Sequence, residues 1–400
     1  MVRIGVSNID SRAIHTIRFP LICLVVCIHS FGFIKGWDVN NLDLHNLSGA
    51  DIYSLFCITF SMTFAHVSVP TFFLISGFLF VKGLEKWNWT VYKGKLNKRV
   101  YSLLIPYLIW NTIRIAKSLV PIVGGVILNN SNISAVTEWW NDNNGLLMYY
   151  HSQTFVERIS WFGEEGFLSF PVLIPMWYVR DLIVLVMLSP LIYWAVQKKL
   201  FLIIVLIIYV SGVYPFIPGL SPSPLLFFST GMFLSIKGYG LIDSLRRYRY
   251  PAYAIFVALW IILIPLAGYR TAEGNYFYPF FIISGVVSIL NIISFYVAKE
   301  EQLNIENRVM SIFRKNENKC FFIYAAHTLI LPYVCKILDK MCMIITNNVD
   351  VSTITFAEQY PVLLIGCYIV KMLIVISLCI IFYNLIQRYT PKFCRILNGR

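Results

Sequence analysis

The stretch Arg18-Phe-Pro-Leu-Ile-Cys-Leu-Val-Val-Cys-Ile-His29 decides the class of this protein, because ten apolar residues separate two ionisable ones. In a helix, this spacing closes about three turns and brings the two side chains within roughly 20° of each other, about 16 Å apart along the axis. Ionisable groups are costly inside a membrane. Arg18 could simply extend to the lipid headgroups, but His29 follows an apolar run where water cannot satisfy it. His29 is therefore the first candidate catalytic residue.

The composition predicts a polytopic membrane protein. Of the 400 residues, 58% are hydrophobic and 13% are charged, whereas about 25% of residues are charged in soluble domains. The formal net charge is +13, but the basic residues lie in short loops between apolar segments, which indicates membrane topology rather than nucleic-acid binding. We therefore expect the lipid bilayer as a partner and no nucleic acid.

The predicted fold is an all-α helical bundle of about ten transmembrane helices, because ten apolar runs are long enough to cross a hydrocarbon core. These runs lie near residues 17–35, 52–81, 100–120, 172–196, 200–214, 222–237, 252–268, 278–298, 320–338 and 361–386. If the N-terminus is cytoplasmic, most of the 33 Lys and Arg residues fall in cytoplasmic segments, as the positive-inside rule requires. Both termini are therefore predicted to be cytoplasmic.

Two of the predicted outer segments are acidic. Residues 36–51 contain three Asp and no Lys or Arg, and residues 121–170 contain five acidic residues against one Arg. The second segment also carries many aromatic side chains, including Trp139, Trp140 and Trp161. These residues suit either an aromatic belt on a re-entrant or surface helix, or a sugar-binding surface.

The chain is predicted to form one membrane domain over residues 1–400, because no internal repeat, low-complexity tract or fused soluble domain is visible. The apolar run after the polar N-terminus lacks an obvious cleavage site and is interpreted as a retained first span. The nine cysteines include no C-x-x-C pair and lie mostly in apolar runs. We interpret them as small core residues, and we expect no metal site.

Several other residues are candidates for a functional site. Ser76 lies beside a glycine in an aromatic run and serves either close helix packing or contact with a substrate. Arg180 and Asp181 are adjacent and so are not expected to face each other on a helix; each then needs another partner, in a structural ion pair or at a site. His327 is a second intramembrane histidine, available for a site or for an interhelical bond, whereas His66 is interpreted as a structural histidine.

A basic segment covers residues 82–99 and contains Lys95, Lys98 and Arg99. Its positive charge exceeds what membrane orientation requires. The segment could therefore attract anionic lipid or a polyphosphorylated ligand. The sequence has no G-x-x-x-x-G-K-[ST], H-E-x-x-H or G-x-S-x-G motif, so nothing in it supports nucleotide hydrolysis, zinc proteolysis or a serine-hydrolase elbow.

Five motifs, taken together and in this order, resemble the integral-membrane acyltransferase family 3. They are Arg18-x10-His29, Val69-Pro-Thr-Phe-Phe-Leu-Ile-Ser-Gly-Phe78, Arg99-Val-Tyr-Ser-Leu-Leu-Ile-Pro-Tyr-Leu-Ile-Trp110, Trp177-Tyr-Val-Arg-Asp-Leu182 and Phe321-Phe-Ile-Tyr-Ala-Ala-His327. The resemblance implies O-acylation, usually acetylation, of an extracytoplasmic glycan or glycolipid by a multi-pass protein of the inner or plasma membrane. Acyl-CoA, most commonly acetyl-CoA, is the implied donor substrate, with no bound cofactor.

The resemblance also implies roles for residues of this chain. The Arg18 and His29 pair is implied to be essential, and donor contact is implied around Arg99. One departure concerns position 102, where relatives often have a second arginine and this chain has Ser102. Lys95 and Lys98 could compensate for that loss. A homo-oligomer is compatible with the sequence, which does not fix the oligomeric state.

Acyl transfer from a thioester to a sugar hydroxyl needs a base, and a neutral imidazole suits this role near pH 7. We expect His29 to act as the general base or to form a transient acyl-imidazole, with Arg18 binding a phosphate or polarising the donor. The alternative is a polytopic transporter or flippase, which would also contain intramembrane charge. Against it, the sequence shows no inverted repeat. Nothing positive supports a membrane sensor or scaffold.

The predicted topology can be tested by cysteine accessibility in sealed cells. Lys93→Cys should be protected from a membrane-impermeant thiol reagent added outside, whereas Asp142→Cys should be labelled, because positively charged loops collect in the cytoplasm. The test is run in a background lacking the native cysteines. Labelling of the first variant and protection of the second would reverse the orientation.

Overall fold

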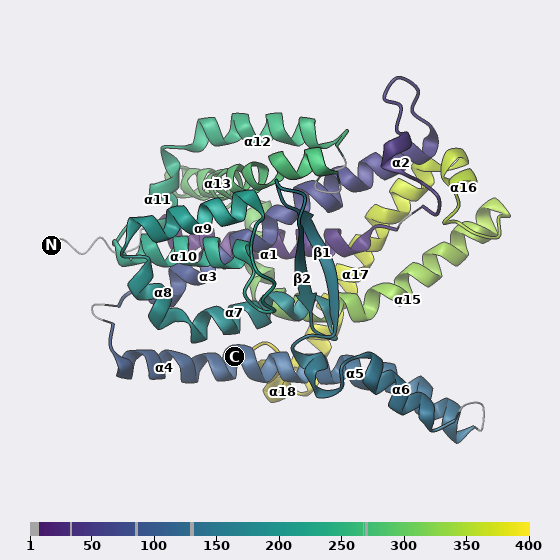
Figure 1. Ribbon diagram of the computed structural model, residues 1–400, viewed down its shortest axis with the longest axis horizontal. Coiled ribbons are helices and arrows are strands. Elements are labelled where there is room, and N and C mark those ends of the chain that lie inside the picture. Colours follow the sequence, from purple (N-terminus) through teal and green to yellow (C-terminus); the bar gives the residue numbers. More distant parts are fainter. Residues whose placement is uncertain (1–7, 33, 85–86, 129–131, 267, 269–270) are drawn as a thin grey trace. The chain divides into compact units, whose positions relative to one another are not determined.

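Helices dominate the structure, as the predicted all-α class requires, and a single two-stranded hairpin is the exception within the residues described (Figure 1). The computed structural model describes residues 8–32, 34–84, 87–128, 132–266, 268 and 271–400. These residues fall into two compact units. The first unit contains residues 1–82 and 230–382, and the second contains residues 83–229 and 383–400.

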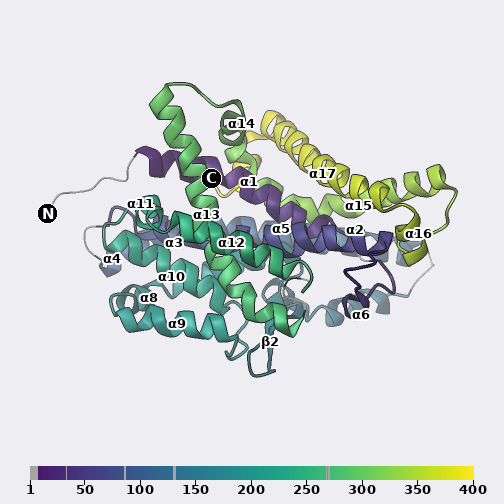
Figure 2. The same cartoon turned by 90° about the horizontal axis from the view of Figure 1, so that it is seen from above.

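Helix α1 (Asn8–Ser30) is the central element of the first unit, because it packs against helices from both ends of that unit's sequence (Figure 2). Ile17, Leu21 and Val26 are all fully buried, so the apolar side chains of α1 pack against other parts of the unit. The helices that pack against it are α3 (Ser68–Val81), α13 (Ala272–Leu303), α14 (Arg308–Asn316) and α15 (Cys320–Thr346). The other helices of this unit are α2 (Gly49–Cys57), α11 (Leu241–Arg246), α12 (Arg249–Leu263), α16 (Ile354–Gln359) and most of α17 (Pro361–Tyr389).

The second expected span is not a regular helix. Between α2 and α3 the chain forms a π-helical turn, η2 (Ile58–Thr63), followed by a 3₁₀ segment, η3 (Phe64–Val67). Helix α1 packs against both segments. Because π and 3₁₀ turns change the rotation per residue, they re-aim the side chains that follow, and such irregularities are frequent at functional sites.

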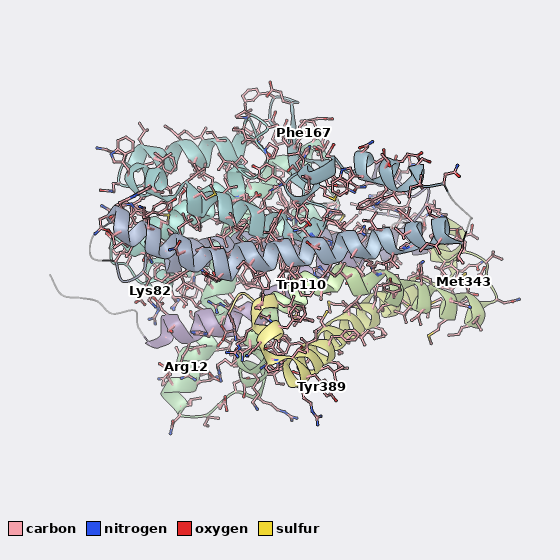
Figure 3. All side chains as sticks on the ribbon, turned by 90° about the horizontal axis from the view of Figure 1, so that it is seen from below. Arg12, Lys82, Trp110, Phe167, Met343 and Tyr389 are labelled. Atoms are coloured by element: carbon pink, nitrogen blue, oxygen red, sulfur yellow. The ribbon has the colours of Figure 1, made fainter. Side chains whose placement is uncertain are left out.

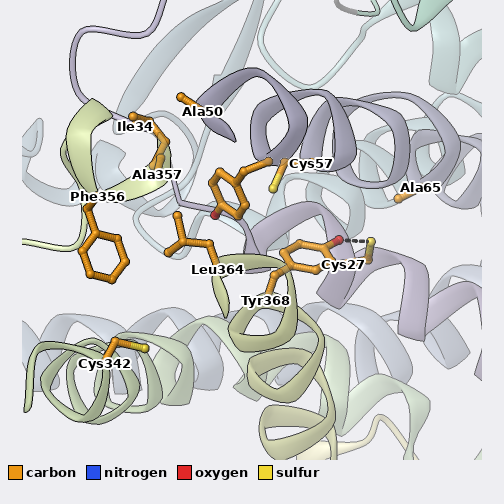
Figure 4. Close-up of a cluster of buried hydrophobic side chains, with 11 residues drawn as sticks. Cys27, Ile34, Ala50, Cys57, Ala65, Cys342, Phe356, Ala357, Leu364 and Tyr368 are labelled. Carbon is orange, nitrogen blue, oxygen red and sulfur yellow. Dashed lines mark hydrogen bonds between the residues drawn. The ribbon is translucent and has the colours of Figure 1, made fainter. Parts of the chain in front are cut away.

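A buried cluster joins α1, α2, α15, α16 and α17 within the first unit (Figure 4). The hydroxyl of Tyr368 lies 2.7 Å from Cys27 Sγ and 2.7 Å from Ser61 Oγ, so the polar atoms of this core are paired with one another. Cys27 and Cys57 contribute to the cluster as buried side chains, as expected from their positions in apolar runs. None of the nine cysteines is in a disulfide.

The second unit consists of helices that come before and after a hairpin in the sequence. Strand β1 (Gln153–Ile159) pairs antiparallel with β2 (Glu165–Phe170), with a bulge between Val156 and Arg158. The helices are α4 (Trp89–Arg99), α5 (Ile105–Ile127), α6 (Ser134–Asp142), α7 (Trp177–Met187), α8 (Ser189–Ala195), α9 (Lys199–Ser211), the start of α10 (Pro222–Ile236) and α18 (Pro391–Leu397). Trp110 on α5 donates a hydrogen bond of 3.0 Å to the carbonyl of Leu397, which fastens α18 to α5 (Figure 3).

The long outer segment differs in part from the re-entrant or surface helix that its aromatic residues suggest. Helix α6 carries Trp139 and Trp140 as expected, but Trp161 lies in the turn of the β1–β2 hairpin. The hairpin is a structural element that the sequence did not predict.

Six helical segments among the described residues are long and apolar enough to span a membrane, at residues 9–30, 49–81, 89–127, 272–303, 308–346 and 361–389. A seventh is counted if α7 and α8, which are bent by 67° at their junction, form one broken span. Pro190 opens α8 and cannot donate a backbone hydrogen bond there. Three further expected spans correspond to shorter apolar helices at residues 200–211, 222–236 and 249–263. The total of ten spans and the side of each terminus stay predictions.

A close approach of two helices in the first unit depends on Gly231. A Cβ atom added at Gly231 of α10 would collide with the carbonyl oxygen of Leu74 and the amide of Phe78 on α3. Small residues allow such backbone contact between helices in lipid. The aromatic run from residue 69 to 79 is therefore a packing surface.

This contact predicts opposite effects for two glycine-to-alanine changes. Gly231→Ala should lower the thermal midpoint of the full chain, because overpacking costs about 1–3 kcal/mol. Gly366→Ala should leave or slightly raise it, since nothing lies within 4 Å of the added Cβ on α17 and alanine favours a helix by about 1 kcal/mol. Thermal unfolding of both variants in one detergent checks this. A midpoint that falls equally in both variants would contradict the packing role of Gly231.

Candidate active site

The structure brings together two of the predicted site residues, His29 and His327. Their ring centroids are 5.2 Å apart and the rings are tilted by 45°. His29 lies in the last turn of α1 and His327 near the start of α15. His327 is fully buried, whereas His29 is half-buried. Two imidazoles therefore meet in the apolar interior of the first unit.

Backbone contacts fix the protonation pattern of His327. Its Nδ1 atom lies 3.1 Å from the carbonyl oxygen of Ile323 and 2.7 Å from that of Tyr324. Carbonyl oxygens only accept hydrogen bonds, so Nδ1 must carry the proton. In the neutral ring Nε2 then holds the lone pair, and this atom is buried without a hydrogen-bond partner among the described residues. A buried acceptor without a partner is unfavourable, so Nε2 is suited to receive a proton or a hydrogen bond during a reaction.

A third histidine lies near this pair. His66 is carried by η3, the segment of the first unit that packs against α1, and it lies within electrostatic range of His29. Its ring also meets Tyr278 edge to face, with centroids 6.2 Å apart. The interpretation of His66 from sequence as a structural histidine did not anticipate this proximity. Among the described residues, these histidines do not form a group that could hold a metal ion.

Arg18 is paired with a carboxylate that the sequence did not single out. Its Nη1 atom donates a hydrogen bond to Oε1 of Glu317, and His15 Nδ1 lies 3.0 Å from the same oxygen. Glu317 precedes α15 in the short 3₁₀ turn η7 (Glu317–Lys319). The Arg18 guanidinium is therefore already part of an ion pair, and a donor phosphate would have to share it with Glu317.

The two contacts are matched in spacing along the two helices. Arg18 precedes His29 by eleven residues on α1, and Glu317 precedes His327 by ten residues in the segment that ends in α15. At about 1.5 Å per residue, these spacings correspond to about 16 Å and about 15 Å. The Arg18–Glu317 pair and the His29–His327 contact thus join two parallel helices at two levels. The ion pair sets the axial register of the helices, and with it the position of one histidine ring beside the other.

A second ionic network holds the start of α1. Arg12 contacts Glu300 at 3.3 Å and Glu301 at 3.2 Å, and Arg314 of α14 contacts Glu300 at 2.9 Å. Glu300 is almost fully buried. A buried carboxylate requires partners of opposite charge, so the two arginines and Glu300 anchor α1 to α13 and α14.

The predicted donor-binding residues Lys95, Lys98 and Arg99 belong to the second unit. The sequence indicates a loop here, but residues 89–99 form helix α4. Their spacing of three and four residues places these cations on one face of α4. Lys98 is exposed, whereas Lys95 and Arg99 are partly buried and have other contacts. The helix could therefore present a positive face to an anionic ligand.

The Arg180 and Asp181 side chains bind each other, which corrects the expectation that adjacent residues need separate partners. Arg180 Nε and Nη2 donate to Asp181 Oδ1 at 2.9 and 2.7 Å, and its other N–H groups bind the carbonyls of Tyr150 and Ser169 and the Ser169 hydroxyl. Asp181 Oδ2 accepts a bond from Ser221. The long arginine side chain folds back because both groups are buried and no water competes for them. All five N–H donors of Arg180 are used within the second unit, which indicates a structural clamp on the hairpin.

Comparison with known proteins identifies the family of this chain. Residues 11–384 match the family described as an acyltransferase domain. The chain belongs to this acyltransferase family. It is also similar to the succinoglycan biosynthesis protein ExoH of Rhizobium meliloti (strain 1021), with 24% identity over 340 residues, which cover 83% of this chain and 79% of that protein. No solved structure matches. The match spans both units and favours an acyltransferase over a transporter or flippase.

Two features of this acyltransferase concern position 102, where relatives often have an arginine. Ser102 lies in a π-helical turn, η4 (Val100–Leu104), and its hydroxyl is buried without a hydrogen-bond partner among the described residues. A Cβ atom on Gly399 would collide with the Ser102 carbonyl, so the C-terminal segment lies directly against this turn. An arginine at position 102 would have to emerge from a tightly packed position.

A charged residue inside the last span of the acyltransferase was not among the predicted site residues. Lys371 is buried in the middle of α17, close to the Cys335 and Asp339 side chains of α15. Lone cations inside apolar runs are usually functional or paired. The sequence feature that could have identified Lys371 is that it is the single lysine within the expected span 361–386. Ser76, by contrast, lies half-buried on α3, two residues from both Leu74 and Phe78, which face Gly231.

The register role of Arg18 can be tested by exchanging the two charges. Arg18→Glu should destabilise the full chain by about 1–3 kcal/mol, because it removes a charge-assisted hydrogen bond and opposes Glu317. The double variant Arg18→Glu/Glu317→Arg should recover most of the lost thermal midpoint. Lys35→Glu, which breaks an exposed pair with Asp350, serves as the control with little effect. A double variant no more stable than Arg18→Glu would show that the pair does not set the register.

Proposed function

We propose that this protein is a membrane O-acyltransferase that moves an acyl group, in the simplest case acetyl, from cytoplasmic acyl-CoA to a hydroxyl of an extracytoplasmic glycan. The observation that carries the proposal is the contact of His29 with His327, whose Nε2 atom lacks a partner among the described residues, in a chain of an acyltransferase family. The similarity to a succinoglycan biosynthesis protein supports a polysaccharide as acceptor.

In this mechanism His29 is the general base. It removes the proton from the acceptor hydroxyl as the oxygen attacks the thioester carbonyl carbon, and the proton then leaves with the CoA thiol. The net result is one new ester bond and one broken thioester bond. A neutral imidazole can do this only if one ring nitrogen is unprotonated and directed toward the acceptor.

His327 supports this orientation of His29. His327 Nε2 has no partner among the described residues, but the ring centroids are only 5.2 Å apart, so a rotation of the His29 ring would bring a hydrogen bond between the two rings within reach. If His29 donates its N–H to His327 Nε2, its other nitrogen is left as the base. His327 therefore acts as a positioning residue whose own tautomer is fixed by Ile323 and Tyr324.

Two sets of residues, one in each unit, are chemically suited to the phosphates of CoA. Lys95, Lys98 and Arg99 on α4 would attract a multiply anionic ligand over a Debye length of about 8 Å at physiological salt. Arg18 would contribute through the part of its guanidinium fork that Glu317 leaves available. The enzyme would then operate in the inner or plasma membrane, with its donor and acceptor on opposite sides.

The roles of the two histidines predict different losses of activity. His29→Ala should reduce kcat by about 10²–10⁴-fold, as expected for loss of a general base. His327→Ala should reduce kcat by at least about tenfold and change its pH profile, whereas His327→Gln should recover part of the activity because its amide oxygen can occupy the place of Nε2.

The measurement is acyl transfer by purified protein, using acetyl-CoA and a polysaccharide acceptor, with product detected by mass spectrometry. His45→Ala, in an exposed outer loop, is the matched control and should keep full activity. A well-folded His29→Ala enzyme with normal turnover would exclude His29 from the chemistry. Equal activity of the His327→Ala and His327→Gln variants would exclude the positioning role.

A further inference from the structure

The first unit contains a pocket directly after the end of α1. Its volume is about 120 Å³, and its walls come from the segment that follows α1, from α2 and from η2. The lining residues include Phe31, Gly32, Trp37, Asp38, Ser54 and Met62. A small concave site with aromatic walls and a few polar groups is typical of a binding site for a small ligand.

The pocket lies close to His29 along the chain. Gly32 is only three residues after His29, so their Cα atoms cannot be more than about 10 Å apart. His29 does not line the pocket, but a ligand that extends from it by about this distance would come close to the proposed base. This distance is comparable to the length of one or two sugar rings.

Trp37 forms a rigid aromatic wall of this pocket. Its Nε1 atom donates a hydrogen bond of 2.8 Å to Oδ1 of Asp51, while Asp51 Oδ2 accepts the backbone amide and the hydroxyl of Ser48 in a capping box at the start of α2. The indole orientation is thus fixed before any ligand binds. Fixed aromatic rings provide large apolar contact area at low entropic cost, and the C–H face of a pyranose ring is a suitable partner for such a surface.

The charge at the pocket is negative. Asp38 is a lining residue with an exposed side chain. The nearest cation in sequence, Lys35, is bound to Asp350 at 2.9 Å. Hydrogen bonds from Ser352 and the Lys35 ammonium hold the pKa of Asp350 below its usual range, so this pair remains ionic at neutral pH. Residues 36–51 contain no Lys or Arg. A carboxylate here can accept hydrogen bonds from hydroxyl groups, but it repels an anionic ligand.

We infer that this pocket holds the acceptor, and that the unit it accepts is a neutral pyranose residue rather than a uronate or a phosphorylated sugar. The sugar would stack on Trp37 and donate hydroxyl hydrogen bonds to Asp38, with a neighbouring hydroxyl directed to His29. This inference rests on the proposed function, and it adds the location of the acceptor site and its charge selectivity.

The test measures binding without any acyl donor, so that its result does not depend on catalysis. Full-length protein in nanodiscs is titrated with methyl glucopyranoside and, separately, with methyl glucuronoside, and binding is followed by saturation-transfer NMR. The neutral and anionic probes differ only at C6. All variants carry His29→Ala as well, which keeps the pocket intact and removes the proposed base.

We expect the glucoside to bind and the glucuronoside to bind at least about tenfold more weakly, because the Asp38 carboxylate repels a carboxylate on the sugar. Asp38→Asn should reduce this difference and weaken glucoside binding by about tenfold, the usual effect of losing a hydrogen bond to a charged group. Trp37→Leu should abolish the saturation transfer. Asp43→Asn is the matched control, since Asp43 lies in the same acidic segment but does not line the pocket.

Three results would overturn the inference. They are equal affinity for both probes, equal effects of Asp38→Asn and Asp43→Asn, and loss of the glucoside signal on addition of a lipid acyl chain that competes for the pocket. The last result would assign the pocket to lipid. Failure of the proposed function has a different signature, because normal acyl transfer by His29→Ala would leave these binding data unchanged.

Discussion

The parallel pairing of α1 with α15 is the constraint on which the site depends. Two polar contacts about three helical turns apart join these helices, the Arg18–Glu317 ion pair at one end and the two histidine rings at the other. In an apolar interior, helices can slide along each other at little cost, because every apolar contact can be replaced by a similar one. A salt bridge has no such substitute. The ion pair therefore gives a precise position to a pair of rings that could not hold that position by themselves.

The sequence allowed the most important half of this arrangement to be predicted. The Arg18-x10-His29 spacing placed two ionisable groups on one helical face, and the order of the five motifs was sufficient to indicate the family. The partner helix was harder to predict. Glu317 is the only carboxylate in the basic stretch from Arg314 to Lys319, but no local pattern shows that its partner is Arg18 on α1. The contact of His29 with His327 is likewise a property of packing between segments almost 300 residues apart.

Other differences have specific physical causes. His66 reaches the neighbourhood of His29 because η2 and η3 interrupt the helix before it, and a uniformly apolar sequence does not show such a change of helical phase. Arg180 pairs with Asp181 although adjacent residues on a helix do not usually face each other. That rule applies to solvated surfaces, where an arginine side chain binds water and does not fold back onto its neighbour. The β1–β2 hairpin was missed because its aromatic residues suggested a membrane interface instead.

The fixed tautomer of His327 has a consequence for the energetics of the cell. A row of histidines inside a membrane is a potential proton wire, along which protons could move down the membrane potential. Such conduction requires each ring to accept a proton on one nitrogen and release it from the other. The Nδ1 proton of His327 is held by the carbonyls of Ile323 and Tyr324, which cannot pass it on. Under the proposed function, this contact would end the row of histidines, so that a base could lie within the bilayer without conducting protons across it.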